Sequence, residues 1–342
     1  ARRMNGSDGK PGIAGMSFLA APSPINKIDN DPQTSQSGLG QFLSNVRRLQ
    51  SVQTEAPFAR AFGSGLGGYV PGSTPTRLPG DLAVLLPAGS DIVMQTHFHP
   101  SGKPETERGK MAIYFADEAP SKKMVNIQIP AMFGIGVGLK VPAGETNYRI
   151  SESFTLPTDI QLISVGAHAH YICREAAMTA TLPNGEIKVL LKIDDWDLDW
   201  QDRYYFKEPL ILPAGTVLTS ELTYDNSADN PENPNNPPRE IRWGRESGDE
   251  MGSVSLQAIA VSESKRPELE KSIRKYMFGS IMQGDFIELL MQLDTNRDGG
   301  LQPAEAPARM QQRFDVLDRN GDGKLTPKEL EILRRLLPKR RD

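Results

Sequence analysis

All four histidines of this 342-residue chain fall in two His-x-His pairs. The first pair is His97 and His99, and the second is His168 and His170. Side chains alternate between the faces of a β-strand, so each pair would place both imidazoles on one face. Two imidazoles on one face, joined by a ligand from another segment, can hold a transition metal. The pairs therefore predict metal chemistry on β-strands, and their wide separation in the sequence indicates two structural units.

The candidate third ligand for the second pair is Met251, in the segment ESGDEMGSV at 246–254. A single methionine is ordinarily core filler, and spacing alone does not make it a ligand. Thioether sulfur suits Cu(I) better than harder divalent ions, so two imidazoles and a thioether would favour copper. Cys173, the only cysteine, would point away from His168 and His170 on a strand, so we interpret it as a buried apolar residue.

Two twelve-residue segments near the C-terminus follow the EF-hand calcium pattern: DTNRDGGLQPAE at 294–305 and DRNGDGKLTPKE at 318–329. Side-chain oxygens come from positions 1, 3 and 5, a carbonyl from position 7, and both oxygens of a Glu from position 12. Every ligand position is intact, which favours two calcium sites over a degenerate pair that no longer binds metal. The predicted ligands are Asp294, Asn296, Asp298, Gly300 and Glu305, and then Asp318, Asn320, Asp322, Lys324 and Glu329.

Residues beside these loops predict how the two hands pair. Leu301 and Leu325 occupy position 8, where paired hands form a short bridge. Thr326 with Glu329 forms a capping box, and Pro327 stands at the first helical position. Since the chain shows no dedicated target-binding segment, we favour a structural use of calcium over a regulatory one.

The rest of the sequence is typical of a mainly β protein. The chain has 31 glycines and 27 prolines, which suit short strands joined by turns. The Asn- and Pro-rich segment 225–238 predicts a long loop, and helical spacing appears at 267–277, at 285–293 and near 39–49. The expected strands are 91–98, 111–115, segments within 124–152, 159–173, 176–182, 186–193, 204–206, 216–224 and 254–261.

Composition excludes several classes of protein. The net charge of −4 gives no indication of a nucleic-acid partner. No apolar run approaches the roughly 18 residues that a membrane-spanning helix needs. A single cysteine excludes an intrachain disulfide and leaves the redox compartment open.

Four segments carry a resemblance to a known family. They are QTHFHPSGK at 95–103, VGAHAHYICRE at 165–175, YDNS at 224–227, and the stretch from Trp243 to the Asp-Glu-Met ending at Met251. Together they resemble the type II copper-, ascorbate-dependent monooxygenases, which include peptidylglycine α-hydroxylating monooxygenase and dopamine β-monooxygenase. The likeness is to bacterial, multi-domain relatives and extends over residues 1–262.

The resemblance implies two jelly-roll β-sandwich domains with one copper each, followed here by the α-helical EF-hand pair. It implies that His168, His170 and Met251 hold the catalytic copper, where O2 binds and a C–H bond of an organic substrate is hydroxylated. His97 would complete an electron-transfer copper site, and the role of His99 stays open. Ascorbate or another reductant would donate electrons, and the protein would be periplasmic or extracellular. The expected domains are 1–152, 153–262, a helical linker at 263–283, and 284–342.

The sequence departs from this family in two ways. The electron-transfer copper normally also takes an adjacent His-His pair upstream, which is missing here. We expect that the chain begins just after that pair, so that its first sandwich is truncated; a single-copper protein is the alternative. The positions that anchor the substrate carboxylate in peptidylglycine enzymes are Gly166, Ser253 and Ser255, which argues against a peptidylglycine substrate.

Three functions are compatible with these motifs. The first is a copper-dependent monooxygenase that acts on a small organic molecule. The second is a non-catalytic copper- and calcium-binding module, and the third is a calcium-responsive scaffold with inert β domains. For His97 and His99, a hydrogen-bonded surface pair is an alternative to metal ligands. We expect Glu175, Asp249 and Glu250 to support the ligands of the catalytic copper.

Overall fold

The structure, a computed structural model, divides the chain into two compact units. One unit includes Met94–Gly284, and the other includes Asp285–Asp342. The described residues are 13–22, 64–69, 77–86, 90–98, 103–104, 106, 111–244, 248–283, 286–291, 293–294, 296, 298–306, 308–311 and 313–336.

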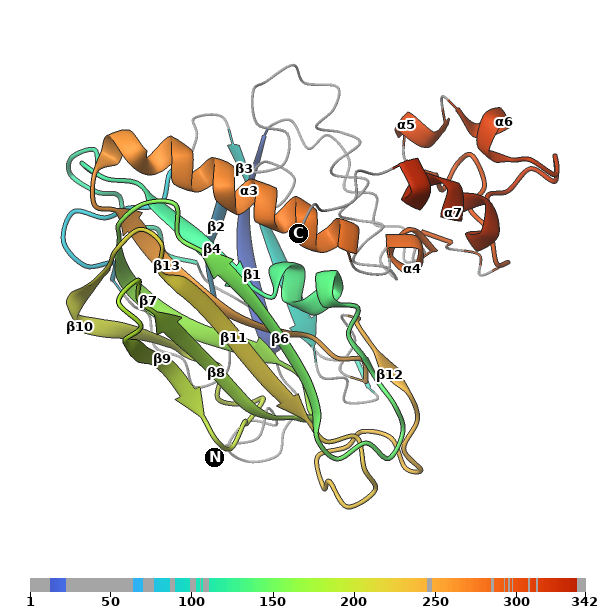
Figure 1. Cartoon of the computed structure of the whole chain (residues 1–342), viewed down its shortest axis with the longest axis horizontal. Coiled ribbons are helices and arrows are strands. Elements are labelled where there is room, and N and C mark those ends of the chain that lie inside the picture. The colour runs from blue at the N-terminus through green and yellow to red at the C-terminus, as the bar shows by residue number, and fades with distance from the viewer. Residues whose placement is uncertain are drawn as a thin grey trace. The chain divides into compact units, whose positions relative to one another are not determined.

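The first unit contains a sandwich of two four-stranded antiparallel sheets (Figure 1). One sheet has the order β10-β7-β13-β4, and the other has the order β6-β11-β8-β9. The mainly β class predicted from the sequence is therefore confirmed, and a jelly-roll sandwich is compatible with it. The strands are β4 (Met124–Ile129), β6 (Tyr148–Thr155), β7 (Ile160–Ala169), β8 (Cys173–Thr181), β9 (Ile187–Ile193), β10 (Arg203–Leu212), β11 (Val217–Tyr224) and β13 (Gly252–Ala260).

Side chains alternate between the two faces of each strand, and those on the inner faces of the two sheets form the core. Leu162 and Leu256 from one sheet and Met178 and Leu218 from the other are completely buried in one cluster. Residues at the alternate positions of β7 and β13 face away from this core, and this outer face carries the histidine pair. The strand period of two therefore separates an apolar core from a polar face.

Three strand predictions need correction. The strand expected at 159–173 ends at Ala169, and Cys173 belongs to β8 in the other sheet. Residues 111–115 do not form a strand, and Tyr114 and Phe115 are 84% and 79% exposed. The short strand expected at 204–206 extends over all of β10, through an irregularity between Tyr205 and Leu210. Pro209 lies within this irregularity, where its missing N–H breaks no regular ladder hydrogen bond.

The sandwich also includes strands from before residue 153. β4 pairs with β13, and β6 pairs with β11 over eight consecutive positions. The two sheets therefore extend across the domain boundary that we expected at 152.

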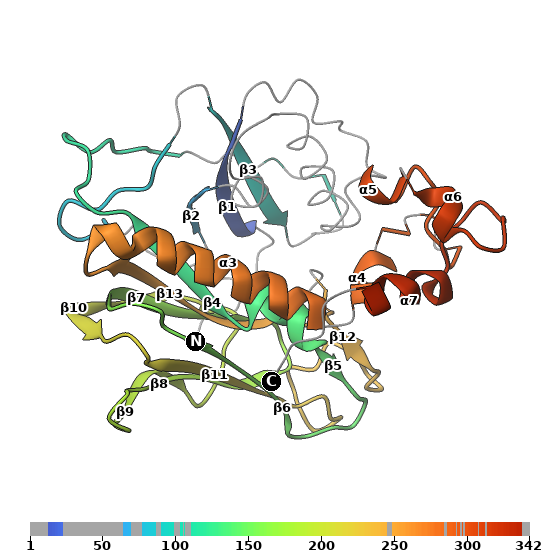
Figure 2. The same ribbon diagram turned by 45° about the horizontal axis from the view of Figure 1, so that its top comes forward.

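A long helix covers the side of the sandwich where β4 and β6 lie. Helix α3 (Arg266–Gln283) follows the short 3-10 turn η3 (Glu263–Lys265) and runs along the two stacked sheets (Figure 2). Its Leu269 and Ile273 join the same core cluster. The Tyr276 hydroxyl donates a 2.8 Å hydrogen bond to Glu152 of β6. The helix predicted at 267–277 is thus confirmed and is longer than expected.

Asparagine side chains order the Asn- and Pro-rich loop. The completely buried Asn226 donates from Nδ2 to the carbonyls of Val141, Pro142 and Arg239, at 3.1, 2.9 and 2.8 Å. These bonds attach the loop to the two-stranded sheet of β5 (Lys140–Val141) and β12 (Ile241–Arg242). These hydrogen bonds therefore hold the loop in one position at the end of the sandwich where His168 and His170 lie.

A separate three-stranded sheet has the order β2-β1-β3. Its strands are β1 (Ile13–Pro22), β2 (Ser64–Tyr69) and β3 (Ser90–Phe98), so the strand predicted at 91–98 is confirmed. His97 lies on β3, but its side chain lies outside the described residues. His99 and the helix expected near 39–49 lie outside them as well.

The second unit is helical in its described C-terminal part. Buried leucines and Phe314 from both loops and their helices form its core. No described helix is long and apolar enough to cross a membrane. The helices are α4 (Phe286–Met291), α5 (Ala308–Gln311), α6 (Phe314–Leu317) and α7 (Pro327–Leu336).

Candidate metal sites

The pairing of β7 with β13 brings the second histidine pair to the segment that carries Met251. Ser253 lies directly opposite His168, and Gly252 lies opposite Ala169. His170 directly follows β7 and Met251 directly precedes β13, so both residues lie at the end of the sheet where His168 lies. The His168 and His170 ring centroids are 5.4 Å apart at an interplanar angle of 88°. The strand register therefore brings the backbones of the three predicted ligand residues to one end of the sheet, where the two imidazoles lie side by side.

A glutamine determines which ring nitrogen of His168 carries the proton. Nδ1 of His168 lies 2.6 Å from Oε1 of Gln201. The Gln201 amide nitrogen donates to the Leu198 carbonyl at 2.8 Å, which orients Oε1 toward the ring. Since Oε1 can only accept, the hydrogen is on Nδ1, and the lone pair of the neutral ring is on Nε2.

A backbone carbonyl has the same effect on His170. Nδ1 of this ring lies 3.0 Å from the carbonyl oxygen of Asp249, which can only accept a hydrogen bond. Both imidazoles therefore share one tautomer, with the proton on Nδ1 and the lone pair on Nε2. A metal-ligating histidine characteristically donates its other N–H to a carbonyl or carboxylate in this way.

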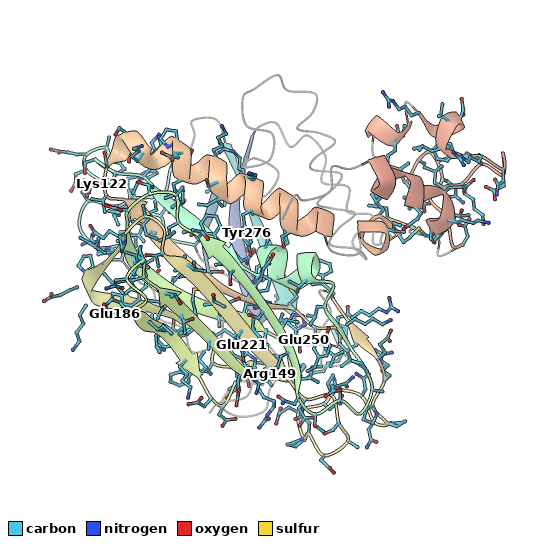
Figure 3. The ribbon with its side chains drawn as sticks, viewed as in Figure 1. Lys122, Arg149, Glu186, Glu221, Glu250 and Tyr276 are labelled. Carbon is cyan, nitrogen blue, oxygen red and sulfur yellow. The ribbon has the colours of Figure 1, made fainter. Side chains whose placement is uncertain are left out.

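The buried carboxyl group of Glu250, which is labelled in Figure 3, accepts hydrogen bonds from both segments that hold these side chains. Its Oε1 accepts from the backbone N–H groups of His170 and, at 2.8 Å, Met251. Its Oε2 accepts from the N–H of Ile172 at 3.2 Å. Burial raises the pKa of Glu250 to about 8. This single side chain therefore positions the backbone of two predicted ligands.

A close approach of Tyr224 fixes the other side of Met251. The completely buried Tyr224 donates its hydroxyl to the Met251 carbonyl at 3.1 Å. A Cβ on Gly252 would lie 1.8 Å from that hydroxyl oxygen. Glycine at 252 is therefore a geometric requirement of the site.

A strained turn places an aromatic ring against His168. The turn is η2 (Ala131–Val137), in which Met132 and Phe133 have φ values of 54° and 58°. These left-handed conformations are rare outside glycine and cost of order 1–3 kcal/mol each. The Phe133 ring lies 5.0 Å from the His168 ring in an edge-on arrangement. The turn therefore supplies an apolar wall beside the imidazole.

The three residues that we expected to support the ligands, Glu175, Asp249 and Glu250, differ in their contacts. Asp249 acts through its backbone carbonyl and Glu250 through its buried carboxylate. Glu175 is exposed on β8, in the other sheet. Sequence reasoning missed Gln201 and Phe133, because neither residue belongs to a motif or lies near a ligand in the sequence. Among the described residues, no three His, Cys, Asp or Glu side chains form a metal-binding cluster, so this candidate depends on methionine as its third ligand.

The calcium loops have the turn that the EF-hand pattern requires. Gly299 and Gly323, at position 6, have φ values of 87° and 82°. The Asp294 carboxylate accepts from the N–H of Gly299 at 2.8 Å, and Asp318 accepts from that of Gly323 at 2.9 Å. Both loops therefore fold around their first acidic residue, and the residues present fit calcium.

The pairing and capping predicted for the hands are also present. Leu301 and Leu325 form an antiparallel bridge through two hydrogen bonds, at 2.9 and 2.8 Å. Pro327 is the first residue of α7, and the N–H of Thr326 donates to Glu329 at 2.9 Å. The hydrogen bond from the Thr326 side chain lowers the pKa of Glu329.

A lysine extends from the second loop to the first. Nζ of Lys324 lies 3.2 Å from the Asp298 carbonyl oxygen and 3.8 Å from the Asp298 carboxylate. A Cβ on Gly300 would lie 2.9 Å from Cδ of Lys324, so the lysine side chain passes directly over Gly300. A cation thus stands beside a predicted ligand of the neighbouring calcium site.

Comparison with known proteins supports the calcium-binding part of the chain. The EF-hand family model matches residues 310–333, which contain the whole second loop. This match covers a small part of the chain and indicates calcium binding there. No curated protein matches the sequence.

Similar solved structures are remote. The family 32 carbohydrate-binding module of C. perfringens NanJ, in complex with galactose, is 10% identical with a TM-score of 0.22, covering 39% of this chain and 93% of its own. The infectious bursal disease virus Gt strain structure is 11% identical with a TM-score of 0.20, covering 71% and 52%. The structure of T=1 particles derived from this virus is 11% identical with a TM-score of 0.24, covering 73% of this chain and 52% of its own. The chain spans about half of those viral proteins, and these TM-scores carry no argument about function.

Glu250→Ala should destabilise the sandwich by about 3 kcal/mol or more, because it leaves three buried N–H groups without an acceptor. Glu250→Gln keeps one oxygen acceptor and should cost about half as much. Urea unfolding of both variants measures the free energy of unfolding. Glu240→Gln, at an exposed position just before β12, is the control. An alanine variant within 0.5 kcal/mol of wild type, a difference typical of surface substitutions, would contradict the role of Glu250 in positioning the two backbone segments.

Lys324→Met should strengthen calcium binding at the first loop by about 3- to 10-fold at low salt, because it removes a cation beside Asp298. The gain should shrink as salt screens the interaction. Calcium calorimetry on the full chain measures both sites, and Lys328→Met, at an exposed position on α7, is the matched control. Equal affinities for the methionine variant and wild type at low salt would refute the coupling.

Proposed function

We propose that this protein is a copper-dependent monooxygenase with a pair of calcium-binding EF-hands. His168 and His170, through Nε2, and Met251, through its sulfur, would hold the catalytic copper. The single observation that carries this proposal is that an acceptor oxygen lies against Nδ1 of each imidazole: Oε1 of Gln201 at His168 and the Asp249 carbonyl at His170.

The chemistry of the donor set supports copper over other metals. Neutral imidazole nitrogens with a thioether suit Cu(I), whereas calcium and magnesium require oxygen ligands. Copper bound there would supply the redox chemistry by which O2, with ascorbate or another reductant, hydroxylates a C–H bond. The resemblance of the His-x-His and Asp-Glu-Met segments to the copper monooxygenases gives the same assignment.

The protein's own residues then prepare the site. Gln201 and the Asp249 carbonyl would hold the ring protons on Nδ1, which leaves the lone pair of each neutral ring on Nε2. Phe133 beside His168 and the burial of Met251, which is 7% exposed, limit the access of bulk water. Glu250 fixes the relative position of the two ligand segments.

The proposal extends to a second copper, export from the cytoplasm and a small organic substrate. His97 on β3 would be one ligand of an electron-transfer copper. We also propose a periplasmic or extracellular location. These parts come from the family resemblance alone.

A second candidate is a non-catalytic module that binds copper and calcium. The burial of the ligands favours it, because His170 and Met251 are each only 7% exposed. A closed site of this kind could retain copper without admitting a substrate. The two candidates share the same ligands and differ in whether O2 is consumed.

Met251→Ala should lower the affinity for Cu(I) and remove the sulfur contribution from the copper X-ray absorption spectrum, while the two imidazoles remain. Met111→Ala, at a partly exposed position outside the sheets, is the control and should leave the spectrum unchanged. A sulfur contribution that persists at wild-type strength in Met251→Ala would exclude this methionine as a ligand.

Copper- and calcium-loaded full-length protein should consume O2 when both ascorbate and a suitable substrate are present. His170→Ala should abolish this consumption, because it removes one of three ligands. Oxygen electrode measurements over a panel of small organic substrates test the enzyme against the binding module. Tight copper binding without substrate-dependent consumption of O2 would favour the module.

A further inference from the structure

The two open sides of the sandwich differ in what covers them. Helix α3 covers the side where the edge strands β4 and β6 lie, and its Leu269 and Ile273 join the core. The opposite side lies between β9 and β10, the other edge strands of the two sheets, away from α3 (Figure 1). A cavity of about 370 Å³ lies there, and every residue that lines it belongs to β7, β9 or β10. The cavity therefore extends from this side toward the core.

Buried aliphatic side chains form the floor of the cavity. Val165 of β7 lines it and belongs to the core cluster between the sheets. On β9, Leu191 lies opposite Met178, but the next paired residue is Val189. Leu190 is the extra residue of this bulge, and Leu190 and Leu191 are both buried in the core cluster. The bulge therefore presents two consecutive leucines to the cavity, where regular alternation would turn one of them outward.

Aromatic side chains form the mouth of the cavity. Tyr204 lies directly opposite Val165 and shares its face, and Phe206 packs against the core two residues further on. Tyr204 is 40% exposed, so the cavity is open to solvent at this ring. The indole Nε1 of the exposed Trp200 donates a 3.2 Å hydrogen bond to the Tyr204 hydroxyl. The hydroxyl keeps its own hydrogen, for which the described residues supply no acceptor.

The charge and the size of the cavity define the ligands that it can take. Lys192 is the one charged residue among those that line it, and its Nζ forms a 2.8 Å ion pair with Asp194. No acidic side chain is among the described residues that line the cavity. An ion would therefore lose its hydration there without compensation, which favours a neutral ligand. The volume lies in the lower part of the range for small-molecule sites, about 300–1,000 Å³.

We propose that this cavity binds a small neutral aromatic molecule that carries a hydrogen-bond acceptor such as a carbonyl group. The ring of the ligand would lie on Leu190 and Leu191 and pack against the rings of Tyr204 and Phe206, because offset and edge-on contacts between aromatic rings are favourable. The Tyr204 hydroxyl would donate its hydrogen to the acceptor group at the mouth.

This binding site is separate from the candidate copper site. Val165 and His168 are three residues apart on β7, so alternation places them on opposite faces of the strand. Val165 faces the core and the cavity, whereas His168 belongs to the outer face. The inference therefore does not depend on the copper chemistry that we propose.

The test uses full-length protein in calcium-containing buffer without added copper. The probe is 6-propionyl-2-(dimethylamino)naphthalene, a neutral aromatic ketone whose fluorescence brightens and shifts to the blue in apolar surroundings. Wild-type protein should bind it saturably, with one probe per chain. Tyr204→Ala should weaken binding at least tenfold, because it removes both the ring and the hydroxyl. Tyr114→Ala, which removes an exposed tyrosine that does not line the cavity, is the control and should bind as wild type does.

Two further variants separate the parts of the site. Tyr204→Phe keeps the ring and should weaken binding of the ketone by about three- to tenfold. The same variant should bind 2-(dimethylamino)naphthalene, which lacks the ketone, as tightly as wild type does. Ile193→Trp would fill the cavity from β9 and should abolish binding of both probes in a protein that keeps the wild-type circular dichroism spectrum.

Three results would overturn the site. The first is that the ketone does not bind saturably to the wild-type protein. The second is wild-type affinity in Tyr204→Ala or in folded Ile193→Trp, because the probe would then lie elsewhere. The third is an equal loss of affinity for both probes in Tyr204→Phe, which would exclude the tyrosine hydroxyl as the donor to the ketone.

Discussion

The candidate copper site depends on one buried carboxylate. Glu250 is completely buried, and its two oxygens accept backbone hydrogen bonds from His170, Ile172 and Met251. His168 and His170 lie at the end of β7, and Met251 lies just before β13. Their ring nitrogens and sulfur could bind one metal only if both backbone segments keep their positions. A carboxyl group that accepts from three N–H donors provides that constraint in a place where water cannot substitute for it.

The surrounding side chains extend this constraint from the backbone to the ligand atoms. Gln201 and the Asp249 carbonyl determine the protonation of the two rings, and Tyr224 holds the Met251 carbonyl. Gly252 is needed because the tyrosine hydroxyl occupies the space of a Cβ. The left-handed turn at Met132 and Phe133 stores strain beside this cluster, as is common at functional sites. These contacts fix the backbones and rings of the candidate ligand residues, and contacts of this kind surround many metal centres.

Features encoded by neighbouring residues were predictable from the sequence. The calcium loops follow from the spacing within twelve consecutive residues, and the bridge between Leu301 and Leu325 and the cap at Thr326 are as predicted. The placement of His168 and His170 on one face follows from alternation along β7. Most strands could also be located, because an apolar residue recurs at every second position.

Features that depend on pairing between distant segments could not be predicted. Gln201 reaches His168 because β10 pairs with β7, and nothing in the residues around Gln201 indicates this. The same pairing brings Arg203 opposite Gly166. The extension of β10 past Tyr205 depends on an irregularity that a local pattern treats as the end of a strand. The positions of Gln201 and Arg203 relative to β7 could be recognised only from the strand register.

The central claim is that both rings of the second pair present Nε2 to a metal. Long-range proton–nitrogen NMR correlation of copper-free protein, labelled with nitrogen-15 in histidine, reports the protonation of each ring nitrogen directly. The account predicts that His168 and His170 are both protonated on Nδ1 and carry no proton on Nε2, and that both Nε2 signals shift when Cu(I) is added. A ring protonated on Nε2, or Nε2 signals that stay in place with copper present, would contradict it.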